Sequence, residues 1–176
     1  MQSHEGRHTA SAGSHEATGA AATQHRRHGA KPYARLAIMI VLSFSAMFLL
    51  MYAMVDRPAN IYSNANQVYM AALMTAPMVV FELMLMGQMY PSKALNATIL
   101  AGSVVLGIVS FVLIRTQTGV GNRQFLQSMI PHHSSAILMC EEAKITDPDI
   151  EALCRSIVLS QQAEIDQMKA ALQRSG

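Results

Sequence analysis

Charged side chains are scarce in this chain of 176 residues: lysine, arginine, aspartate and glutamate make up 14% of it. A soluble domain contains about 25% of these residues, so the deficit points to segments inside a lipid bilayer. Tryptophan is absent. Cysteine occurs only twice, and two cysteines cannot form a scaffold held by several disulfides. The sequence also contains no Gly-rich phosphate loop, and its basic residues do not cluster with aromatic residues as in nucleic-acid-binding proteins.

Three long apolar runs account for the missing charge. Residues 36–55 and 95–114 contain no charged side chain, and each run has about the 20 residues that a helix needs to cross a bilayer. Residues 68–90 are apolar apart from Glu82 and one glutamine. The first run resembles a signal peptide in position, but a long polar segment precedes it and no small-residue cleavage site follows, so we expect a retained anchor. We therefore expect a three-span membrane domain over residues 35–115.

The segment before the first span, residues 1–34, is rich in alanine, glycine, serine and threonine and has no apolar periodicity. We expect it to be a disordered tail, since it cannot bury enough apolar surface to offset the loss of chain entropy. Five of the seven histidines lie there: His4, His8, His15, His25 and His28. Such a tail can hold metal ions loosely, or it can simply be a polar segment that orients the first span.

Two helical patterns follow the third span, over about residues 122–145 and 148–173. Between them Asp147 can cap the second helix and Pro148 can occupy its first position. The short link makes the helices antiparallel neighbours, so we expect a helical-hairpin domain over residues 122–173.

Several uncommon residues converge on one seam of this expected hairpin. Residues at equal distances from the turn should face each other, and these pairs are Cys140 with Cys154, His133 with Gln161, and Met129 with Ile165, with Met168 one turn away. The two cysteines can form a disulfide, remain as two buried thiols or bind a soft metal, and we favour the first two over metal binding. Phe125, Ile130, Ile137, Val158 and Leu159 are apolar positions outside this seam, which favours a homodimer or higher oligomer. In the alternative, the bilayer surface or the first external loop covers these residues.

The residues of the seam favour a metal site over a catalytic one. Imidazole, thioether and thiolate groups together favour Cu(I), Cu(II) or Zn(II), whereas Glu141 and Glu142 are expected to point away from the seam. Cys140 lies roughly 10 Å along the helix from His133 at about 1.5 Å per residue, too far for direct activation of a nucleophile. We therefore do not expect an enzyme.

Pro131 stands directly before the two histidines, and two interpretations remain open. Inside a helix, proline removes one backbone donor and clashes with the carbonyl of Gln127, which would kink the helix and open room for a ligand. Alternatively, the helix begins at Pro131 after a separate turn.

The stretch QFLQSMIPHHSSAILMCEEA, with the later QQAEIDQM, closely resembles the domain-of-unknown-function family 305, whose hallmarks are M-I-P-H-H and Q-x-E-I-x-x-M. The Met-rich spans resemble the membrane-anchored branch of that family. The resemblance implies a ferritin-like helical fold and an association with copper binding and copper tolerance in bacteria. The ligands that it implies are Met129, His132, His133, Met139 and Met168. Because this chain has a single hairpin, a four-helix bundle would need a second chain.

Ten of the 14 methionines lie between Met39 and Met89. Met70, Met74, Met78, Glu82 and Met86 follow one another at a spacing of four residues, on one face of the second span. These thioethers either line a path for Cu(I) or simply fill gaps in the packing, and packing is the commoner use of methionine. Glu82 differs, because an ionisable group within a span points to function.

Together, the residues and the resemblance lead us to expect a copper-binding protein of the bacterial inner membrane. It would buffer copper outside the cytoplasm, or exchange it with donor and acceptor proteins, and zinc is the less favoured ion. In the alternative, the hairpin is a structural module that dimerises without metal, and the histidine pair bonds to Gln161. A small copper redox enzyme ranks third.

Basic residues predict the orientation of the chain. Arg26, Arg27, Lys31 and Arg35 precede the first span, whereas the following loop contains only Arg57. The positive-inside rule then places the N-terminus in the cytoplasm and, after three spans, the C-terminus outside. A reporter that fluoresces only in the cytoplasm, fused to the C-terminus, should therefore stay dark, while the same reporter at the N-terminus should be bright. A bright C-terminal fusion would contradict this topology.

Overall fold

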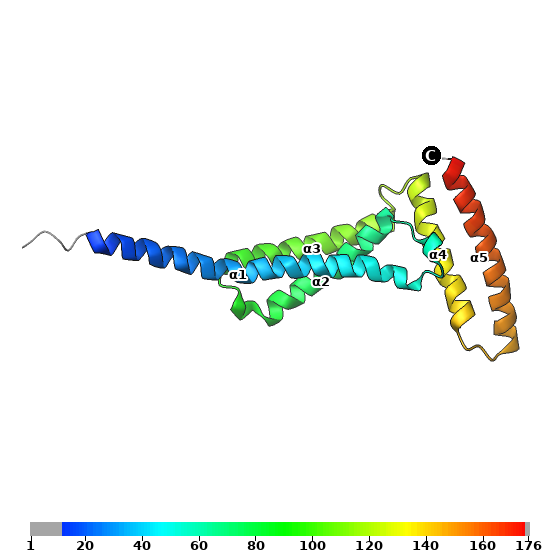
Figure 1. The fold of residues 1–176 in the computed structure, drawn as a ribbon, viewed down its shortest axis with the longest axis horizontal. Helices are drawn as coiled ribbons and strands as arrows, with labels where there is room; N and C mark the ends of the chain where they lie inside the picture. Colours follow the sequence, from blue (N-terminus) through cyan, green and yellow to red (C-terminus); the bar gives the residue numbers. More distant parts are fainter. Residues whose placement is uncertain (1–11, 175–176) are drawn as a thin grey trace, which may run out of the picture.

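A computed structural model of the chain describes residues 12–174, with side chains from Lys31 onward. Within this range all regular structure is helical, as the sequence predicts (Figure 1). The α-helices are α1 (Ala12–Leu50), α2 (Ala65–Leu85), α3 (Lys93–Thr116), α4 (Asn122–Glu142) and α5 (Pro148–Arg174), and the short 3-10 turns are η1 (Met51–Met54), η2 (Pro58–Asn60) and η3 (Gly87–Met89). Residues 1–11 and the side chains of all five tail histidines lie outside the described part. The backbone of residues 12–34 is helical and continuous with the first span in α1, whereas the composition of this segment led us to expect a disordered tail.

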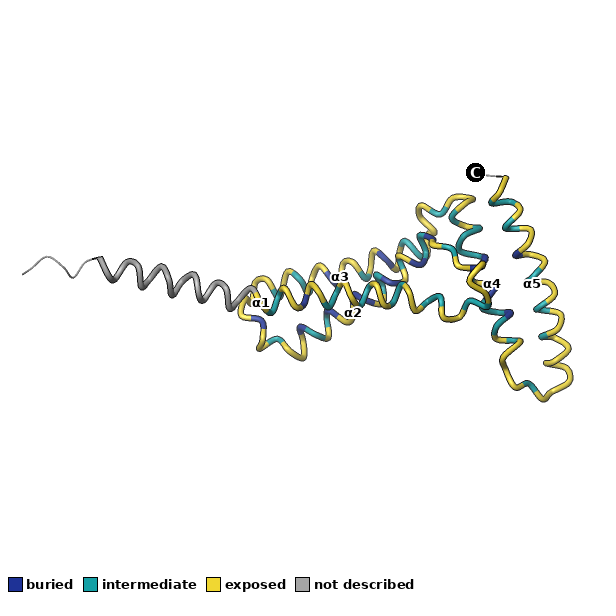
Figure 2. Tube along the Cα trace, in the orientation of Figure 1, coloured by how far each residue is buried: buried dark blue, intermediate teal, exposed yellow. Residues whose placement is uncertain are grey.

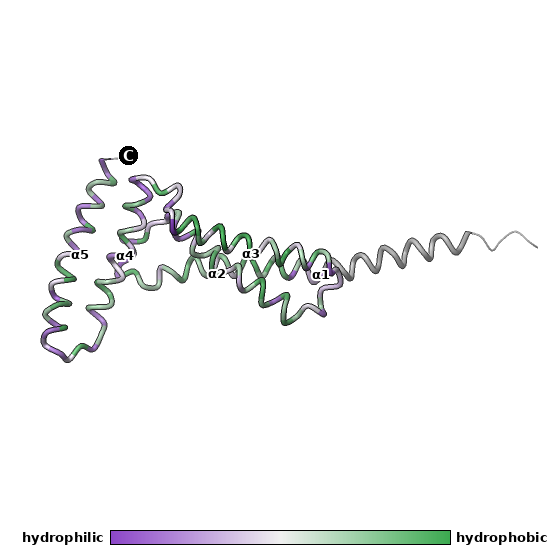
Figure 3. The backbone as a smooth tube through the Cα atoms, turned by 180° about the vertical axis from the view of Figure 1, so that it is seen from behind, coloured by the Kyte–Doolittle hydropathy of each residue, from purple (hydrophilic) through white to green (hydrophobic). Residues whose placement is uncertain are grey.

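Three of these helices are long and apolar enough to cross a membrane, over Lys31–Met54, Ala65–Leu85 and Lys93–Thr116. Their apolar character contrasts with the many hydrophilic positions of α5 (Figure 3). The second span ends five residues earlier than the predicted residue 90, because α2 gives way to η3 after Leu85. Asn64 and Ser92 define the starts of α2 and α3, since their side chains accept hydrogen bonds from the backbone N–H groups of Gln67 and Leu95.

Small residues allow α3 to pack closely against α2. Ser103 and Ser110 on α3 are buried, and a Cβ atom added at Gly107 would lie 3.5 Å from the Cβ of Ala76 on α2. Such small residues let two helix backbones approach within a membrane, where apolar burial alone does not drive association. On the other side, Leu36 of α1 joins a buried cluster with Val79, Leu83 and Tyr90, and α2 therefore packs against both neighbours.

The α4–α5 hairpin lies across one end of the three spans, with α4 on the side of the spans and α5 outside (Figure 1). Asp147 caps α5 by accepting hydrogen bonds from the N–H groups of Asp149 and Ile150, and Pro148 occupies the first helical position, as the sequence predicts. The disulfide between Cys140 and Cys154 joins the two helices, with Cα atoms 5.3 Å apart. The predicted proximity of the two cysteines is thus confirmed.

The core of the hairpin differs from the predicted seam. Ile130, Ile137 and Ile165 are its fully buried members, whereas the sequence analysis placed Ile130 and Ile137 on an uncovered face. They are covered without a second copy, because α4 also packs against the segment that joins α1 to α2, where Tyr62 contacts this cluster. Cover by this first loop is the alternative that the sequence analysis left open for these positions. Partly buried members are Val158, Met168 and Leu172. The end of the hairpin around its turn lacks such cover and is exposed (Figure 2).

The close packing of α3 against α2 can be tested with a larger side chain at Gly107. Gly107→Leu should lower the free energy of unfolding by about 1–3 kcal/mol, because a branched side chain would be forced into the contact with Ala76. Gly102→Leu is the matched control, since a Cβ added there meets no atom within 4 Å. Thermal unfolding of both variants in detergent, followed by circular dichroism, measures the difference. Equal stability of the two variants would contradict the packing.

Candidate functional site

The proline of the M-I-P-H-H stretch lies inside α4, which runs without interruption from Asn122 to Glu142. The interpretation in which a helix begins at Pro131 is therefore wrong. Proline has no N–H to donate to Gln127, and the carbonyl of Gln127 instead accepts a long hydrogen bond of 3.4 Å from the side-chain amide of Asn64. Since Asn64 is the cap of α2, the proline frees a carbonyl through which the hairpin attaches to the membrane domain.

His133 is buried, and both of its ring nitrogens have partners. Nδ1 lies 2.9 Å from the carbonyl oxygen of Met129, one turn earlier on α4. Nε2 lies 2.6 Å from Oε2 of Glu164 on α5. Because a carbonyl and an ionised carboxylate only accept, the two bonds need two protons in all: either a doubly protonated imidazole beside a carboxylate, or a neutral imidazole beside a protonated Glu164.

Glu164 takes the place that the sequence analysis assigned to Gln161. His133 was paired with Gln161 because both lie at the same distance from the turn. That pairing did not take into account that side chains on a helix lean toward its N-terminus. On α4 that direction leads away from the turn, so the imidazole of His133 reaches a residue about one turn farther along α5. The same contact places a carboxylate at the seam, although Glu141 and Glu142 are exposed as expected.

The remaining candidate ligands are spread over several surroundings. His132 is exposed, with its ring centroid 6.1 Å from that of His133. Met168 packs against the isoleucine cluster of the hairpin, while the side chain of Met139 is 53% exposed. Among the side chains that the structure describes, from Lys31 to Arg174, no group of three or more histidine, cysteine, aspartate and glutamate residues is placed to hold a metal ion. Cys140 and Cys154 are joined as a disulfide, so neither offers a thiolate.

Ser134, the residue after His133, connects the hairpin to the loop that follows the first span. Its fully buried hydroxyl accepts a hydrogen bond of 2.8 Å from the backbone N–H of Asp56 and donates one to the Asp56 carboxylate. Asn60 donates a second bond to that carboxylate at 2.6 Å, and Arg57 pairs with it at 3.2 Å. Burial acts to raise the pKa of Asp56, but these hydrogen bonds and the Arg57 charge together hold it below its ordinary value.

Three residues of this arrangement escaped the sequence analysis: Asp56, Ser134 and Glu164. Glu164 carried a signal, since it is the glutamate of the Q-x-E-I-x-x-M stretch. Asp56 and Ser134 are 78 positions apart, and no periodicity relates a loop residue to a helix so distant in sequence.

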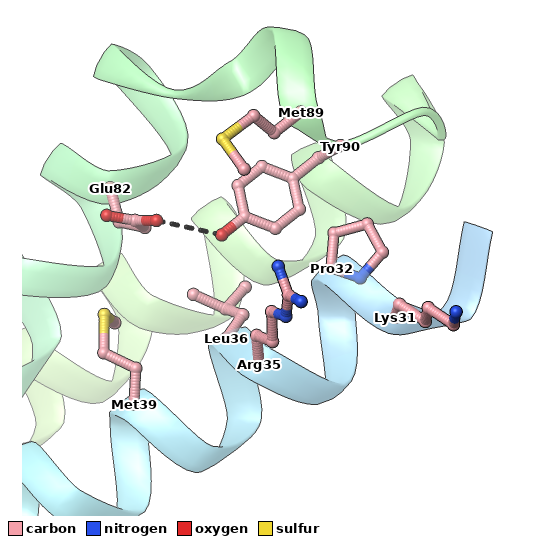
Figure 4. A pocket seen from close by; sticks show the side chains of 8 residues that line it. All are labelled: Lys31, Pro32, Arg35, Leu36, Met39, Glu82, Met89 and Tyr90. Carbon is pink, nitrogen blue, oxygen red and sulfur yellow. Dashed lines mark hydrogen bonds between the residues drawn. The ribbon is translucent and has the colours of Figure 1, made fainter. Parts of the chain in front are cut away.

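Glu82, the ionisable group of the second span, lines a separate cavity at the other end of the spans (Figure 4). The hydroxyl of Tyr90 donates a 3.0 Å hydrogen bond to Oε1 of Glu82. The cavity has a volume of about 360 Å³, and its other lining residues are Lys31, Pro32, Arg35, Leu36, Met39 and Met89. Met70, Met74 and Met78 are more than a third exposed on α2 and do not line this cavity.

Comparison with known proteins gave two matches. The family described as Domain of unknown function (DUF305) matches residues 113–172, which covers the end of α3, all of α4 and nearly all of α5. The chain is also 33% identical over 138 residues to the uncharacterized protein L153 of Acanthamoeba polyphaga mimivirus, a match that covers 77% of this chain and 89% of the viral protein. That match is longer than the hairpin, so it extends into the membrane-spanning helices. No solved structure matches the chain.

The bonds between Ser134 and Asp56 predict a pH-dependent effect on stability. Ser134→Ala should lower the free energy of unfolding by about 2 kcal/mol at pH 7, because a buried ionised carboxylate loses a donor. Asp56 has a lowered pKa, so its stabilising contribution is present above the pKa of the unfolded chain and is lost as the pH falls through the folded value. The difference between wild type and variant should therefore shrink in acid.

Ser135→Ala is the control for this measurement, since the Ser135 hydroxyl donates within α4, to the carbonyl of His132. Denaturant unfolding of both variants between pH 7 and pH 3 gives the comparison. A Ser134→Ala variant as stable as Ser135→Ala at neutral pH would contradict the proposed attachment.

Proposed function

Because the chain belongs to the DUF305 family, we propose that its α4–α5 hairpin is a copper-binding module carried on a three-span membrane anchor. It buffers copper or hands it on, and no catalytic step is assigned to it. The resemblance of the M-I-P-H-H stretch to copper-associated members of the family leads to this ion. The contacts of His133 and Glu164 are the observation that carries the proposal.

The orientation of His133 suits a metal ligand. Histidines that bind metals usually donate the proton of their other ring nitrogen to a carbonyl or carboxylate, and here Nδ1 lies 2.9 Å from the Met129 carbonyl. Nε2 then presents its lone pair to Glu164, whose Oε2 is 2.6 Å away. A metal ion held between Nε2 of His133 and the Glu164 carboxylate would take the place of the shared proton, which would be released to solvent. The half-exposed Glu164 side chain leaves room for the outward movement that this would need.

The type of donor favours Cu(II). Imidazole nitrogen and carboxylate oxygen are ligands that suit Cu(II), whereas Cu(I) prefers sulfur. His132, exposed beside His133, is the nearest additional imidazole and can complete the coordination after a rotamer change. Met129 and Met168, each one turn from His133 or Glu164 along its helix, are the thioether donors that would suit the ion if it were delivered as Cu(I). Zinc remains the less favoured ion.

A second copy of the chain can contribute to the module. Phe125, Leu153 and Leu159 are at least half exposed on the hairpin. Two hairpins packed together would cover these side chains and form a four-helix bundle, which is the ferritin-like arrangement that the resemblance implies. A homo-oligomer is therefore part of the proposal.

We place the hairpin outside the cytoplasm of a bacterial inner membrane. The basic residues before the first span support this orientation. The disulfide between Cys140 and Cys154 supports it independently, since disulfides persist in oxidising compartments. Copper donor and acceptor proteins would meet the hairpin on that side.

A structural role is the alternative function, and one observation favours it. Both nitrogens of His133 already have partners, so the imidazole can serve as a clamp between α4 and α5 without any metal. In that case the hairpin is an interaction module whose exposed apolar side chains bind a second copy.

Copper titration of the full chain in detergent distinguishes the two functions. We expect His133→Gln and Glu164→Gln each to weaken Cu(II) binding by about 10- to 100-fold, since each removes one of the two donors. Asp166→Asn, an acidic position two residues away whose carboxylate bonds to Gln162 on the same helix, should bind as wild type does. Metal analysis and isothermal titration provide the affinities.

Equal copper affinity in all four proteins would contradict the copper site. If the affinities are equal while thermal unfolding shows that Glu164→Gln is destabilised relative to Asp166→Asn, the structural clamp is the better description.

A further inference from the structure

The cavity around Glu82 lies at the end of the spans that is remote from the hairpin (Figure 1). It is bounded by the start of the first span, at Lys31, and by the segment that joins α2 to α3. Helices of this length end where the hydrocarbon gives way to lipid headgroups. The cavity therefore opens at the depth of the headgroups rather than in the middle of the bilayer.

Charge decides which kind of ligand this cavity suits. Lys31 and Arg35 contribute two positive charges, whereas Glu82 contributes at most one negative charge. Between residues 31 and 174 neither cation is engaged in an ion pair. Glu82 already accepts a hydrogen bond from Tyr90. The net positive charge of the lining repels a metal cation and attracts an anion, even though Met39 and Met89 offer thioethers nearby.

The rest of the lining is apolar, which favours a lipid over a soluble anion as the ligand. Leu36 and Tyr90 are almost fully buried, and together with Met39 and Met89 they form an apolar wall next to the cations. Figure 4 shows Arg35 extending toward Tyr90, with Lys31 one turn earlier on α1 and Glu82 on the opposite side. A ligand that fills this space needs an anionic group beside the cations and apolar atoms along the wall.

We propose that this cavity binds the headgroup of an anionic phospholipid. The phosphate lies between Lys31 and Arg35, and the first part of an acyl chain contacts Leu36 and Met39. Hydroxyl groups of a headgroup such as phosphoglycerol donate to Glu82, which keeps the carboxylate away from the phosphate. A volume of about 360 Å³ accommodates the headgroup, and the acyl chains continue into the bilayer.

The test uses the full chain in a mild detergent, titrated with dioleoyl phosphatidylglycerol and followed by native mass spectrometry. Lys31→Gln/Arg35→Gln should weaken lipid binding by about 25-fold, at roughly fivefold for each basic residue near an anionic headgroup. Lys93→Gln/Arg115→Gln is the control, because it makes the same change in net charge at helix ends that do not line the cavity. Circular dichroism verifies that both double variants are folded.

Two further arms separate the lipid from other ligands. Glu82→Gln should raise the affinity for phosphatidylglycerol, because the phosphate loses a like charge nearby while the glutamine oxygen can still accept from Tyr90 or from a headgroup hydroxyl. Millimolar inorganic phosphate should not displace the lipid, since phosphate makes no contact with the apolar wall. Dioleoyl phosphatidylcholine, which has the same acyl chains but no net charge, should bind at least tenfold more weakly.

The proposal is overturned if the two double variants lose affinity equally, which would indicate general electrostatic attraction, or if neither loses it. Displacement by inorganic phosphate would replace the lipid with a soluble anion. A tenfold loss in Glu82→Gln would indicate a cationic ligand instead.

Discussion

The attachment of Ser134 to Asp56 is the contact on which the position of the hairpin depends. The Ser134 hydroxyl both accepts from the Asp56 backbone and donates to its carboxylate, so it fixes the orientation of α4 as well as its distance from the loop. The bond is buried and charge-assisted, which makes it stronger than an ordinary surface hydrogen bond. His133 is the preceding residue, and the same contact therefore determines where its imidazole lies relative to the spans.

Polar groups at the start of α2 extend this attachment. The side chain of Gln124 accepts a hydrogen bond from the N–H of Ala65, and the Gln127 carbonyl accepts from Asn64. Ala65 is the first residue of α2, and its backbone N–H would otherwise lack an acceptor within the helix, whereas Asn64 is the cap of α2 and donates through its side-chain amide. Pro131 contributes by releasing the Gln127 carbonyl from the helical pattern. A residue that disfavours helices thus becomes part of the link between the hairpin and the membrane domain.

The two candidate sites lie at opposite ends of the spans and suit ligands of opposite charge. At the hairpin end, the ring nitrogen of His133 and the carboxylate of Glu164 suit a cation. At the other end, Lys31 and Arg35 outnumber Glu82 and suit an anion. Met70, Met74 and Met78 are exposed along α2 and do not line the cavity at this other end.

The sequence by itself determined the three apolar spans, the start of α5 after Asp147 and the proximity of Cys140 and Cys154. Each of these follows from local rules: the length of an apolar run, a cap at Asp147, and equal distances from a short turn. Only the tertiary structure decided that Glu164 rather than Gln161 meets His133, that Ile130 and Ile137 are buried, and that Ser134 binds Asp56. These depend on how far a side chain leans along its helix and on which distant segment covers each face. Neither quantity is encoded in the spacing of residues along one helix, because both arise from contacts between segments far apart in the chain.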